Sequence, residues 1–600
     1  MIKSWLTEFN LVWQSFLQTE LGLTPIELND EPELSWQWGA RGRGDLVNSA
    51  ALKLGQRTDE PPYELAERLA SGFQQCLPLG LAVKIEVARP GFLNLYFSQS
   101  CWPELTKASQ GAPEINNAGR TDQQSRHWLI EFGQPNTHKV PHIGHLFSYV
   151  FGQALANLFE ATGDRVTRLN YQGDIGPHVA KCLYAISQQP FSADQLSGEE
   201  LALARVNYLQ SCYQAGALAY ADDPTAKIAI DQINQALYRG DQEWCGLWLR
   251  TRQWSLDYYQ LFEAEIGIKY TKSYLESQLF AEGQAIAQKA TEAQNGQTAI
   301  LVRDQGAIIF KPDPEKPTEA KLHTRVFISS ADTPTYEAKE LGLFQAKLRD
   351  FEFDYSLTTT ANEQNGYFQV VNYVASRIWP TRLAGKIEHL GYGLMNLTTG
   401  KMSSRTGQMV TAFDLVAQTK QAVSQYLAAN RDYSLEQIEE ICQAVAWGAI
   451  KYSFLKQTAT KNMSFDLASS ISFEGDSGPY LQYTYARTQT LLAKAKSQSS
   501  EQGTDSVSEL VYTETEQQLI LTLLAWPDVL TEAKAMRSLH QVATWLYRLA
   551  SQFSKFYEAT PVNHEANPVL RQRRLKLVQS VATGLREGLA LMGIECLDQI

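Results

Sequence analysis

Residues 128–145 read WLIEFGQPNTHKVPHIGH, which combines a strand, a loop and the start of a helix. The apolar run Trp128 to Phe132 predicts the strand, and Leu146 to Gly163 predicts an amphipathic helix that is closed by its glycine. A second strand is expected at Arg165 to Tyr171. Strand, crossover helix and strand form the βαβ unit of a doubly wound, parallel α/β sheet.

The string His142-Ile143-Gly144-His145 lies where this strand turns into its helix. Free N–H groups and the dipole at a helix N-terminus favour anions such as phosphate. Histidines three residues apart can face one ligand there and donate hydrogen bonds to its phosphoryl oxygens, while Gly144 leaves room for a nucleotide and Lys139 adds a cation. The pattern predicts a nucleotide site; the plain alternative is a helix start with two incidental histidines.

A second motif lies far along the chain. Residues 400–407 read GKMSSRTG and follow a predicted strand at Ile387 to Asn396. A loop with two cations and two hydroxyls suits a leaving pyrophosphate. On its own such a loop is usually a solvated surface, so its weight comes from its combination with the histidine string.

The rest of the chain divides around this α/β centre. Residues 1–118 indicate an α+β unit with a helix at Pro62 to Cys76, and residues 110–124 indicate a linker. The segment 180–290 is mostly helical and is expected to be an insertion. After about Phe413 helices dominate to Ile600, which predicts a bundle. Further strands are expected at Thr298–Val302, Ala307–Phe310, Arg325–Ser330 and Tyr355–Thr360.

Together and in this order, the two motifs resemble those of the class I aminoacyl-tRNA synthetases. Nearly the whole chain is similar to one family of that class, the arginyl-tRNA synthetases. The segments that carry this resemblance are 131–136, 170–176, 333–340, 362–368, 478–487 and 584–594. The resemblance implies a Rossmann-type catalytic domain at 119–415 with its helical insertion, an N-terminal tRNA-contacting module at 1–118, and an all-α anticodon-binding bundle at 416–600.

The resemblance also implies a function: ATP-dependent ligation of L-arginine to tRNA(Arg) through arginyl-adenylate, with release of AMP and pyrophosphate. The substrates and partners would be arginine, tRNA(Arg) and ATP with Mg²⁺, and the enzyme would act as a monomer. Two alternatives stay open, a class I synthetase for another amino acid and a non-catalytic tRNA-binding relative. Glu340, where the family usually has aspartate, keeps the first alternative open.

Site residues follow from the same resemblance. Catalysis would rest on Lys139, His142, His145 and Lys401. ATP would meet His142, Gly144, His145, Gly391, Met395, Lys401, Met402, Ser403 and Ser404. Arginine would bind Glu131 and Asn136 at its α-amino and carboxylate end, and Tyr336, Glu340 and Gln364 at its side chain, because a planar cation with five donors needs fixed oxygen acceptors. For tRNA, the bundle offers cations for phosphates and aromatic rings for unpaired bases, and the plain alternative is a bundle with ordinary surface charges and core aromatics. The candidate tRNA contacts are Tyr480, Gln482, Arg487, Arg548, Tyr557, Arg573 and Arg574.

Composition sets outer limits on these expectations. The chain has 600 residues, which allows about three to five domains. Its formal net charge of −12 means that a nucleic acid must be met by a local basic surface. Seven cysteines without a Cys-x-x-Cys pair argue against zinc and against a disulfide framework. We also expect no membrane span, no secretory signal, no protein metal site, and a cytoplasmic location.

Overall fold

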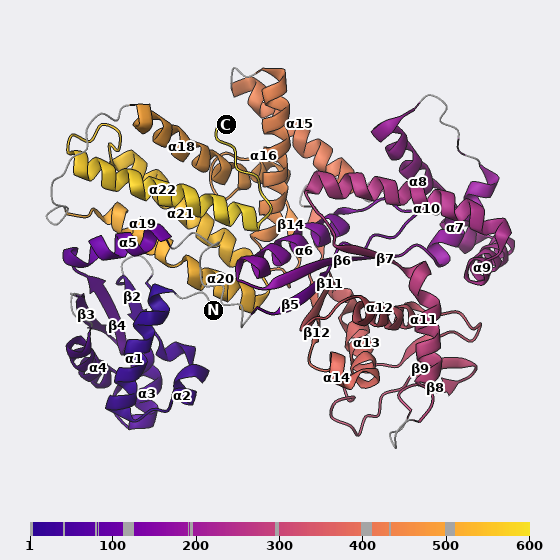
Figure 1. Cartoon of the computed structure of the whole chain (residues 1–600), viewed down its shortest axis with the longest axis horizontal. Coiled ribbons are helices and arrows are strands. Elements are labelled where there is room, and N and C mark those ends of the chain that lie inside the picture. Colours follow the sequence, from indigo (N-terminus) through magenta and orange to yellow (C-terminus); the bar gives the residue numbers. More distant parts are fainter. Residues whose placement is uncertain are drawn as a thin grey trace.

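The computed structural model describes residues 4–39, 43–77, 81, 83–111, 125–189, 191, 196–293, 299–397, 411–430, 434–497 and 511–600. A central parallel sheet separates a C-terminal helical bundle from a helical insertion, and the N-terminal module lies beneath the bundle (Figure 1). The motif at 400–407 falls outside the described residues, as does most of the linker at 110–124.

The N-terminal module packs helices against a four-stranded antiparallel sheet in the order β1-β2-β4-β3. Its core is aromatic, with the ring centroids of Trp13 and Phe73 4.7 Å apart. Pro62 begins the helix that ends at Cys76, as the sequence predicts. The elements are α1 (Trp5–Leu21), α2 (Pro25–Asp30), β1 (Gln37–Trp38), β2 (Leu46–Asn48), α3 (Ala50–Thr58), α4 (Pro62–Cys76), β3 (Val83–Ala88), β4 (Phe92–Phe97) and α5 (Trp102–Gly111).

The central sheet has five strands in the order β12-β11-β5-β6-β7, and all neighbouring pairs are parallel. Its strands are β5 (His127–Glu131), β6 (Arg165–Gln172), β7 (Lys272–Leu275), β11 (Tyr355–Ala361) and β12 (Ile387–Tyr392). Helix α6 (Ile143–Ala161) covers one face, while α11 (Glu276–Lys289), α12 (Tyr336–Asp350) and α13 (Asn365–Ile378) lie on the other side (Figure 1). Along β5, Ile130 packs with the α6 cluster and Leu129 with the α11–α12 cluster, which is the two-sided burial of a parallel sheet.

The insertion and a small second sheet extend from this centre. The insertion consists of α7 (Pro177–Gln188), α8 (Gly198–Asp222), α9 (Pro224–Arg239) and α10 (Gln242–Ile266). The small sheet consists of β8 (Val302–Asp304), β9 (Ala307–Phe310) and β10 (Arg325–Ile328). It is antiparallel, in the order β10-β9-β8, and is separate from the central sheet.

Among the described residues, the longer helices that follow the sheet build the bundle. They are α15 (Ala412–Asn430), α16 (Leu435–Leu455), α18 (Gly478–Ser497), α19 (Glu514–Leu524), α20 (Trp526–Met536), α21 (His540–Ala559) and α22 (Pro568–Leu591). Shorter elements are α14 (Pro380–Leu383), α17 (Leu467–Ser470), and the paired strands β13 (Met395–Leu397) and β14 (Met463–Phe465). The bundle packs on α6 through α16, α20 and α22.

Three strand expectations differ from the structure. The predicted strand at 298–302 is formed only from Val302 on among its described residues, because Leu301 packs into a helix-covered cluster instead. The strand expected over 387–396 is two strands, since Gly393 leaves the sheet and donates to the carbonyl oxygen of Ala459. Strand β7 interrupts the helical segment expected at 180–290.

Candidate active site

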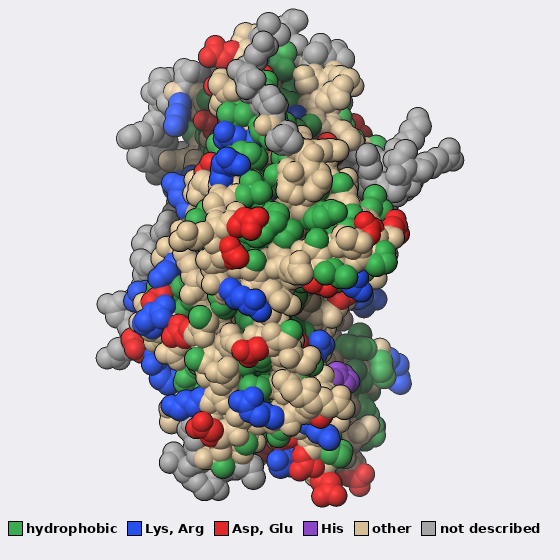
Figure 2. All heavy atoms as spheres, turned by 90° about the vertical axis from the view of Figure 1, so that its right-hand side faces the viewer, with side chains coloured by type: hydrophobic (Ala, Val, Ile, Leu, Met, Phe, Trp, Pro, Cys, Tyr) green, Lys and Arg blue, Asp and Glu red, His purple; other side chains and the backbone are tan. Residues whose placement is uncertain are grey.

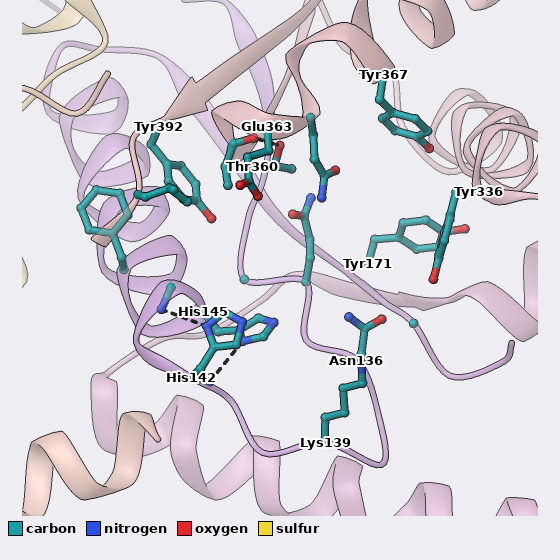
Figure 3. Close-up of a pocket in the computed structure, with 18 of the residues that line it drawn as sticks. Asn136, Lys139, His142, His145, Tyr171, Tyr336, Thr360, Glu363, Tyr367 and Tyr392 are labelled. Atoms are coloured by element: carbon teal, nitrogen blue, oxygen red, sulfur yellow. Dashed lines mark hydrogen bonds between the residues drawn. The ribbon is translucent and has the colours of Figure 1, made fainter. Parts of the chain in front are cut away.

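A cleft of about 800 Å³ opens at the carboxyl ends of the parallel strands. Ligands of doubly wound sheets bind at this edge. Figure 3 shows two ends of the cleft: His142 and His145 lie at one, and Tyr171, Tyr336 and Tyr367 at the other. We call them the histidine end and the tyrosine end.

At the histidine end, the two histidines cap the first turn of α6. The backbone N–H of Gly144 donates to His142 Nδ1 at 3.0 Å, and the backbone N–H of His142 donates to His145 Nδ1 at 3.2 Å. Burial lowers the pKa of both rings, and the Lys139 cation lowers it further. Both rings are therefore neutral near pH 7, and with Nδ1 accepting, each proton sits on Nε2. The two Nε2–H groups can donate to an anion without a repulsive charge.

The loop that carries Asn136 and Lys139 is held by the helical insertion. The Tyr259 hydroxyl on α10 lies 2.6 Å from the Asn136 carbonyl oxygen and 2.9 Å from that of Lys139. The backbone N–H of Val140 donates to Gln210 Oε1 of α8 at 3.0 Å. The Lys139 ammonium lies 4.3 Å from the centroid of the Tyr213 ring, also on α8. The insertion thus fixes the position of this loop beside the cleft.

His138 is the residue of this loop that the sequence analysis passed over. Its side chain is fully buried, and its Nδ1 and Nε2 lie 2.9 Å and 2.8 Å from the hydroxyls of Thr137 and Thr251. Its backbone φ of 63° is in the left-handed region, which a non-glycine residue adopts only when its contacts require it. Burial lowers its pKa to about 3, so that it stays a neutral structural group.

The wall of the cleft beside the histidine end is lined by Phe147, Tyr392, Gly393 and Met395. Met395, expected near adenine, is on the cleft wall. Gly391 is behind that wall, because a Cβ there would lie 2.0 Å from Asn365 Oδ1. The remaining expected ATP contacts at Lys401 to Ser404 lie outside the described residues.

At the tyrosine end, four of the five residues expected to bind arginine line the cleft: Asn136, Tyr336, Glu340 and Gln364. Tyr336 is 53% exposed and so is free to meet a ligand. Glu340 is 9% exposed on the first turns of α12. Burial, and next the charge of Glu131, raise the pKa of Glu340 well above its usual value.

Glu131 does not reach the cleft surface. It is 1% exposed, and its Oε2 lies 2.6 Å from Lys347 Nζ. Its Oε1 accepts from Gln134 Nε2 at 2.6 Å, and Gln134 lines the cleft. The prediction that Glu131 lines the arginine pocket is therefore wrong: Glu131 lies beneath Gln134, which lines the cleft in its place.

Several cleft residues were not singled out from the sequence: Tyr171, Gly173, Glu276, Arg325, Tyr367 and Lys347 beneath them. One signal was available for Lys347. Tyr336, Glu340 and Lys347 are spaced four and seven residues apart, which places them on one face of a helix. No comparable local signal marks Glu276, which begins α11 after a strand that the sequence did not reveal.

The residues expected to contact tRNA divide into exposed and buried groups. Tyr557 is 37% exposed, and the Arg487 guanidinium lies 4.0 Å from its ring centroid. Gln482 is completely buried and donates to the carbonyl oxygens of Ala444 and Glu595.

Arg573 and Arg574 do not fit the expected phosphate contact. Both are 8% exposed and bond to Glu516, which is 1% exposed. Their charge is therefore used inside the bundle, where it satisfies a buried carboxylate, and the expectation for these two residues and for Gln482 is not supported.

Tyr480 and Arg548 are the two remaining candidates. The Tyr480 hydroxyl lies 3.2 Å from Ser554 Oγ, and burial lowers the pKa of Arg548.

On the insertion side of the molecule, basic and acidic side chains are interspersed among the coloured residues (Figure 2). Over the described ranges, no group of three or more His, Cys, Asp and Glu side chains could hold a metal ion, and no helix is long and apolar enough to cross a membrane.

Comparison with known proteins covers all three parts of the chain. Residues 114–467 match the family model for the catalytic domain of class I (R) tRNA synthetases. Residues 24–97 match the N-terminal domain of arginyl-tRNA synthetases, and residues 481–600 match the DALR anticodon-binding domain.

Individual relatives agree with these matches. The chain is 28% identical over 526 residues to arginine–tRNA ligase of Parabacteroides distasonis, covering 84% of this chain and 86% of that protein. It is 29% identical over 534 residues to the same enzyme of Phocaeicola vulgatus, with coverage of 84% and 86%. The fold is that of the Thermus thermophilus arginyl-tRNA synthetase, with a TM-score of 0.77 over 99% of this chain and all of the other at 22% identity. Because the class I (R) model alone covers more than half of its residues, the chain belongs to the arginyl family of class I tRNA synthetases.

Proposed function

We propose that this chain ligates L-arginine to tRNA(Arg) in two steps within the cleft. One observation supports this most directly: a single cavity joins neutral donors at a helix N-terminus to a buried carboxylate, Glu340, at its far end. ATP phosphates suit the first end and a guanidinium suits the second. The reacting carboxylate and α-phosphate would meet between the two ends, near Asn136, which also lines the cleft (Figure 3).

In the first step, an oxygen of the arginine carboxylate attacks the α-phosphorus of ATP, and the bond from that phosphorus to the bridging oxygen breaks as pyrophosphate leaves. The Nε2–H groups of His142 and His145 and the Lys139 ammonium would stabilise the charge that develops on phosphoryl oxygens. Lys401 would neutralise the leaving pyrophosphate. Mg²⁺ would arrive with ATP as part of the substrate, and we assign no side chain to it.

In the second step, the terminal ribose 2′-hydroxyl of tRNA attacks the arginyl carbonyl carbon and AMP leaves. The resemblance to the family implies the choice of the 2′-hydroxyl and a need for bound tRNA during activation. Tyr336, Glu340 and Gln364 would hold the arginine side chain, and Asn136 its α-amino and carboxylate end. Glu131 would act at one remove by fixing Gln134.

We propose a division into a tRNA-contacting module at 1–118, a catalytic domain at 119–415 and an anticodon-binding bundle at 416–600. Arg487, Arg548, Tyr480 and Tyr557 are the bundle residues that we keep as candidates for tRNA contact. The enzyme would act as a monomer in the cytoplasm, where tRNA charging serves translation.

The test is pyrophosphate exchange into ATP with each amino acid, with and without tRNA(Arg). We expect exchange with arginine and a strong dependence on tRNA. The variant Glu340→Gln should raise KM for arginine far more than KM for ATP, since it removes the charge that meets the guanidinium. Glu363→Gln is the matched control, because Glu363 is an exposed glutamate on the same cleft wall. Equal effects of Glu340→Gln on both substrates would mean that the arginine pocket is misplaced.

A further inference from the structure

Buried carboxylates surround the tyrosine end of the cleft, and all but one of them have a basic partner. Their exposed fractions are between 0% and 9%. The pairs, with N–O distances, are Glu131–Lys347 (2.6 Å), Asp174–Arg252 (3.0 Å), Glu276–Lys339 (2.5 Å) and Glu337–Arg325 (3.7 Å). Each of these carboxylates is matched by one cation, so the four pairs add no net charge to this end.

Glu340 is the exception. It makes no hydrogen bond or ion pair with any residue that the structure describes, although it is 9% exposed and lines the cleft. A carboxylate in such a place costs several kcal/mol unless it gains a partner or a proton. The tyrosine end therefore offers one unpaired buried carboxylate to a bound ligand.

Because Lys347 pairs with Glu131, Glu340 is left as the one unpaired member of these buried carboxylates. It follows Glu340 by seven residues on α12, two helical turns on, so both side chains leave the same face of the helix. Its side chain is 1% exposed and runs beneath the cleft, where Nζ lies 2.6 Å from Glu131 Oε2 and 3.4 Å from Ser356 Oγ. Without this ammonium, Glu131 and Glu340 would be two neighbouring buried carboxylates with no cation between them.

We infer that Lys347 is a positioning residue for amino-acid selection: it takes up the charge of Glu131, so that Glu340 is the one buried carboxylate at the tyrosine end left to meet a guanidinium. This inference rests on the proposed function, since it assumes that arginine is the substrate. It adds that the fit to a monocation is set by a lysine that never touches the substrate.

The groups that face Glu340 support this view. Glu131 from β5, Glu276 from α11 and Glu337 from α12 raise its pKa after burial itself, and Lys347 is the cation that opposes them. Tyr171 from β6 and Tyr367 from α13 complete the surroundings. Arginine binds the charged form of Glu340, so KM for arginine rises as the pH falls below the pKa of Glu340. Loss of Lys347 raises that pKa further and moves the rise in KM to higher pH.

The experiment measures KM for arginine and for ATP from pH 6 to 9 by tRNA-dependent pyrophosphate exchange, with the full chain. Four proteins are compared: wild type, Lys347→Met, Lys347→Arg, and the double variant Glu131→Gln with Lys347→Met. Lys347→Met keeps the side-chain length without the charge and should raise KM for arginine roughly tenfold or more near neutral pH, because one nearby cation shifts a carboxyl pKa by about 1 to 3 units. KM for ATP should change little.

The double variant is the decisive arm, because it removes the carboxylate and the lysine together and restores the net charge. We expect its pH profile for arginine to return toward that of wild type, and Lys347→Arg to behave as wild type. If Lys347→Met fails to fold, the double variant and Lys347→Arg still report.

The inference is overturned if Lys347→Met leaves KM for arginine unchanged, or if the double variant keeps the shifted profile of Lys347→Met. A wild-type protein that shows no exchange with arginine would instead overturn the proposed function.

Discussion

The backbone N–H of Ala412 donates to the carbonyl oxygen of Pro141 at 2.9 Å, and the neighbouring Thr411 forms an isolated antiparallel bridge with His142. On the other side of the undescribed segment 398–410, Met395 lines the same cleft. The chain thus leaves and re-enters the described structure beside the histidine end. The described residues on both sides of the lysine and serine motif therefore lie at the cleft.

The position of these flanking residues leads to a prediction for the motif. Lys401→Ala should lower the rate of arginine activation at least roughly tenfold, because a cation near the leaving pyrophosphate is lost, and should leave the melting temperature unchanged. Burst measurements of adenylate formation with saturating tRNA report the rate. Lys289→Ala, an exposed lysine at the end of α11, is the control. A wild-type rate for Lys401→Ala would remove the motif from the phosphate site.

The histidine end predicts a loss of rate with a particular pH dependence. His145→Ala should lower the activation rate at least roughly tenfold while the fold persists, since it removes one transition-state donor. Because the pKa of His145 lies well below its ordinary value, the wild-type ring stays neutral and its contribution should not change between pH 8 and 6.5. Single-turnover rates across that range test both points, with the exposed His564→Ala as control. A wild-type rate that falls with a midpoint near 6.5 would contradict the neutral donor.

The insertion predicts an effect on catalysis from a helix outside the cleft. Tyr259→Phe removes the hydroxyl that bonds the carbonyl oxygens of Asn136 and Lys139, so the loop between them should lose its fixed position. We expect a lower activation rate together with a loss of roughly 1 kcal/mol in stability. Tyr258→Phe is the matched control, a buried neighbour whose hydroxyl has no described hydrogen-bond partner. Equal behaviour of the two variants would mean that the hydroxyl is unimportant to the loop.

Glu263 predicts how stability changes with pH. Burial raises its pKa to about 7, while its carboxylate accepts from Tyr149 and Asn170. The folded protein holds this proton between about pH 4.5 and 7, where the unfolded chain has lost it, so the group's stabilising contribution is present at low pH and disappears as the pH rises to 7. At pH 8, the free energy of unfolding of Glu263→Gln should therefore exceed that of wild type by roughly 1 to 3 kcal/mol. At pH 5, the two proteins should have about the same free energy of unfolding. No difference at pH 8 would contradict the buried, ionised carboxylate.

The bundle predicts that two arginines have different roles. Arg487→Ala should weaken tRNA binding with little change in stability, because its guanidinium lies over the exposed Tyr557 ring. Arg573→Ala should lower stability by about 3 kcal/mol or more, because it leaves Glu516 with one cation fewer in the interior. Filter binding of tRNA and urea unfolding separate the two effects. If Arg573→Ala instead weakened tRNA binding without lowering stability, Arg573 would be a tRNA contact after all.

The sequence predicted well wherever a local signal sufficed. The spacing of apolar residues, with the proline at the start of α4 and the glycine after α6, predicts the ends of these helices within a few residues. The string from His142 to His145 correctly indicates the turn from strand to helix. It failed where partners are distant in the chain. Strand β7 contains Lys272 and Ser273, and it becomes a strand through pairing with β6, about a hundred residues earlier.

The same limit applies to the site. Polarity suggested that Arg573 and Gln482 lie on the surface, but each is satisfied by groups that the fold brings from far along the chain, Glu516 for one and the Glu595 carbonyl for the other. Glu131 was placed in the pocket by its family motif, yet its ion pair with Lys347 joins a strand to a helix more than two hundred residues later. Which side chains are buried and which line the cleft depends on tertiary contacts, and a local sequence pattern does not reveal these contacts.

The N-terminal module has a consequence for how the chain is made. The Trp38 indole donates to Asp528 at 2.9 Å across 490 residues, and Gln99 exchanges two hydrogen bonds with Tyr512 across 413. A ribosome adds roughly 5 to 20 residues each second, so the finished module waits on the order of 20 to 80 s before its docking surface has been synthesised. During that interval the module must stand alone in the crowded cell, with Trp38 uncovered, because its partner Asp528 is made 490 residues later.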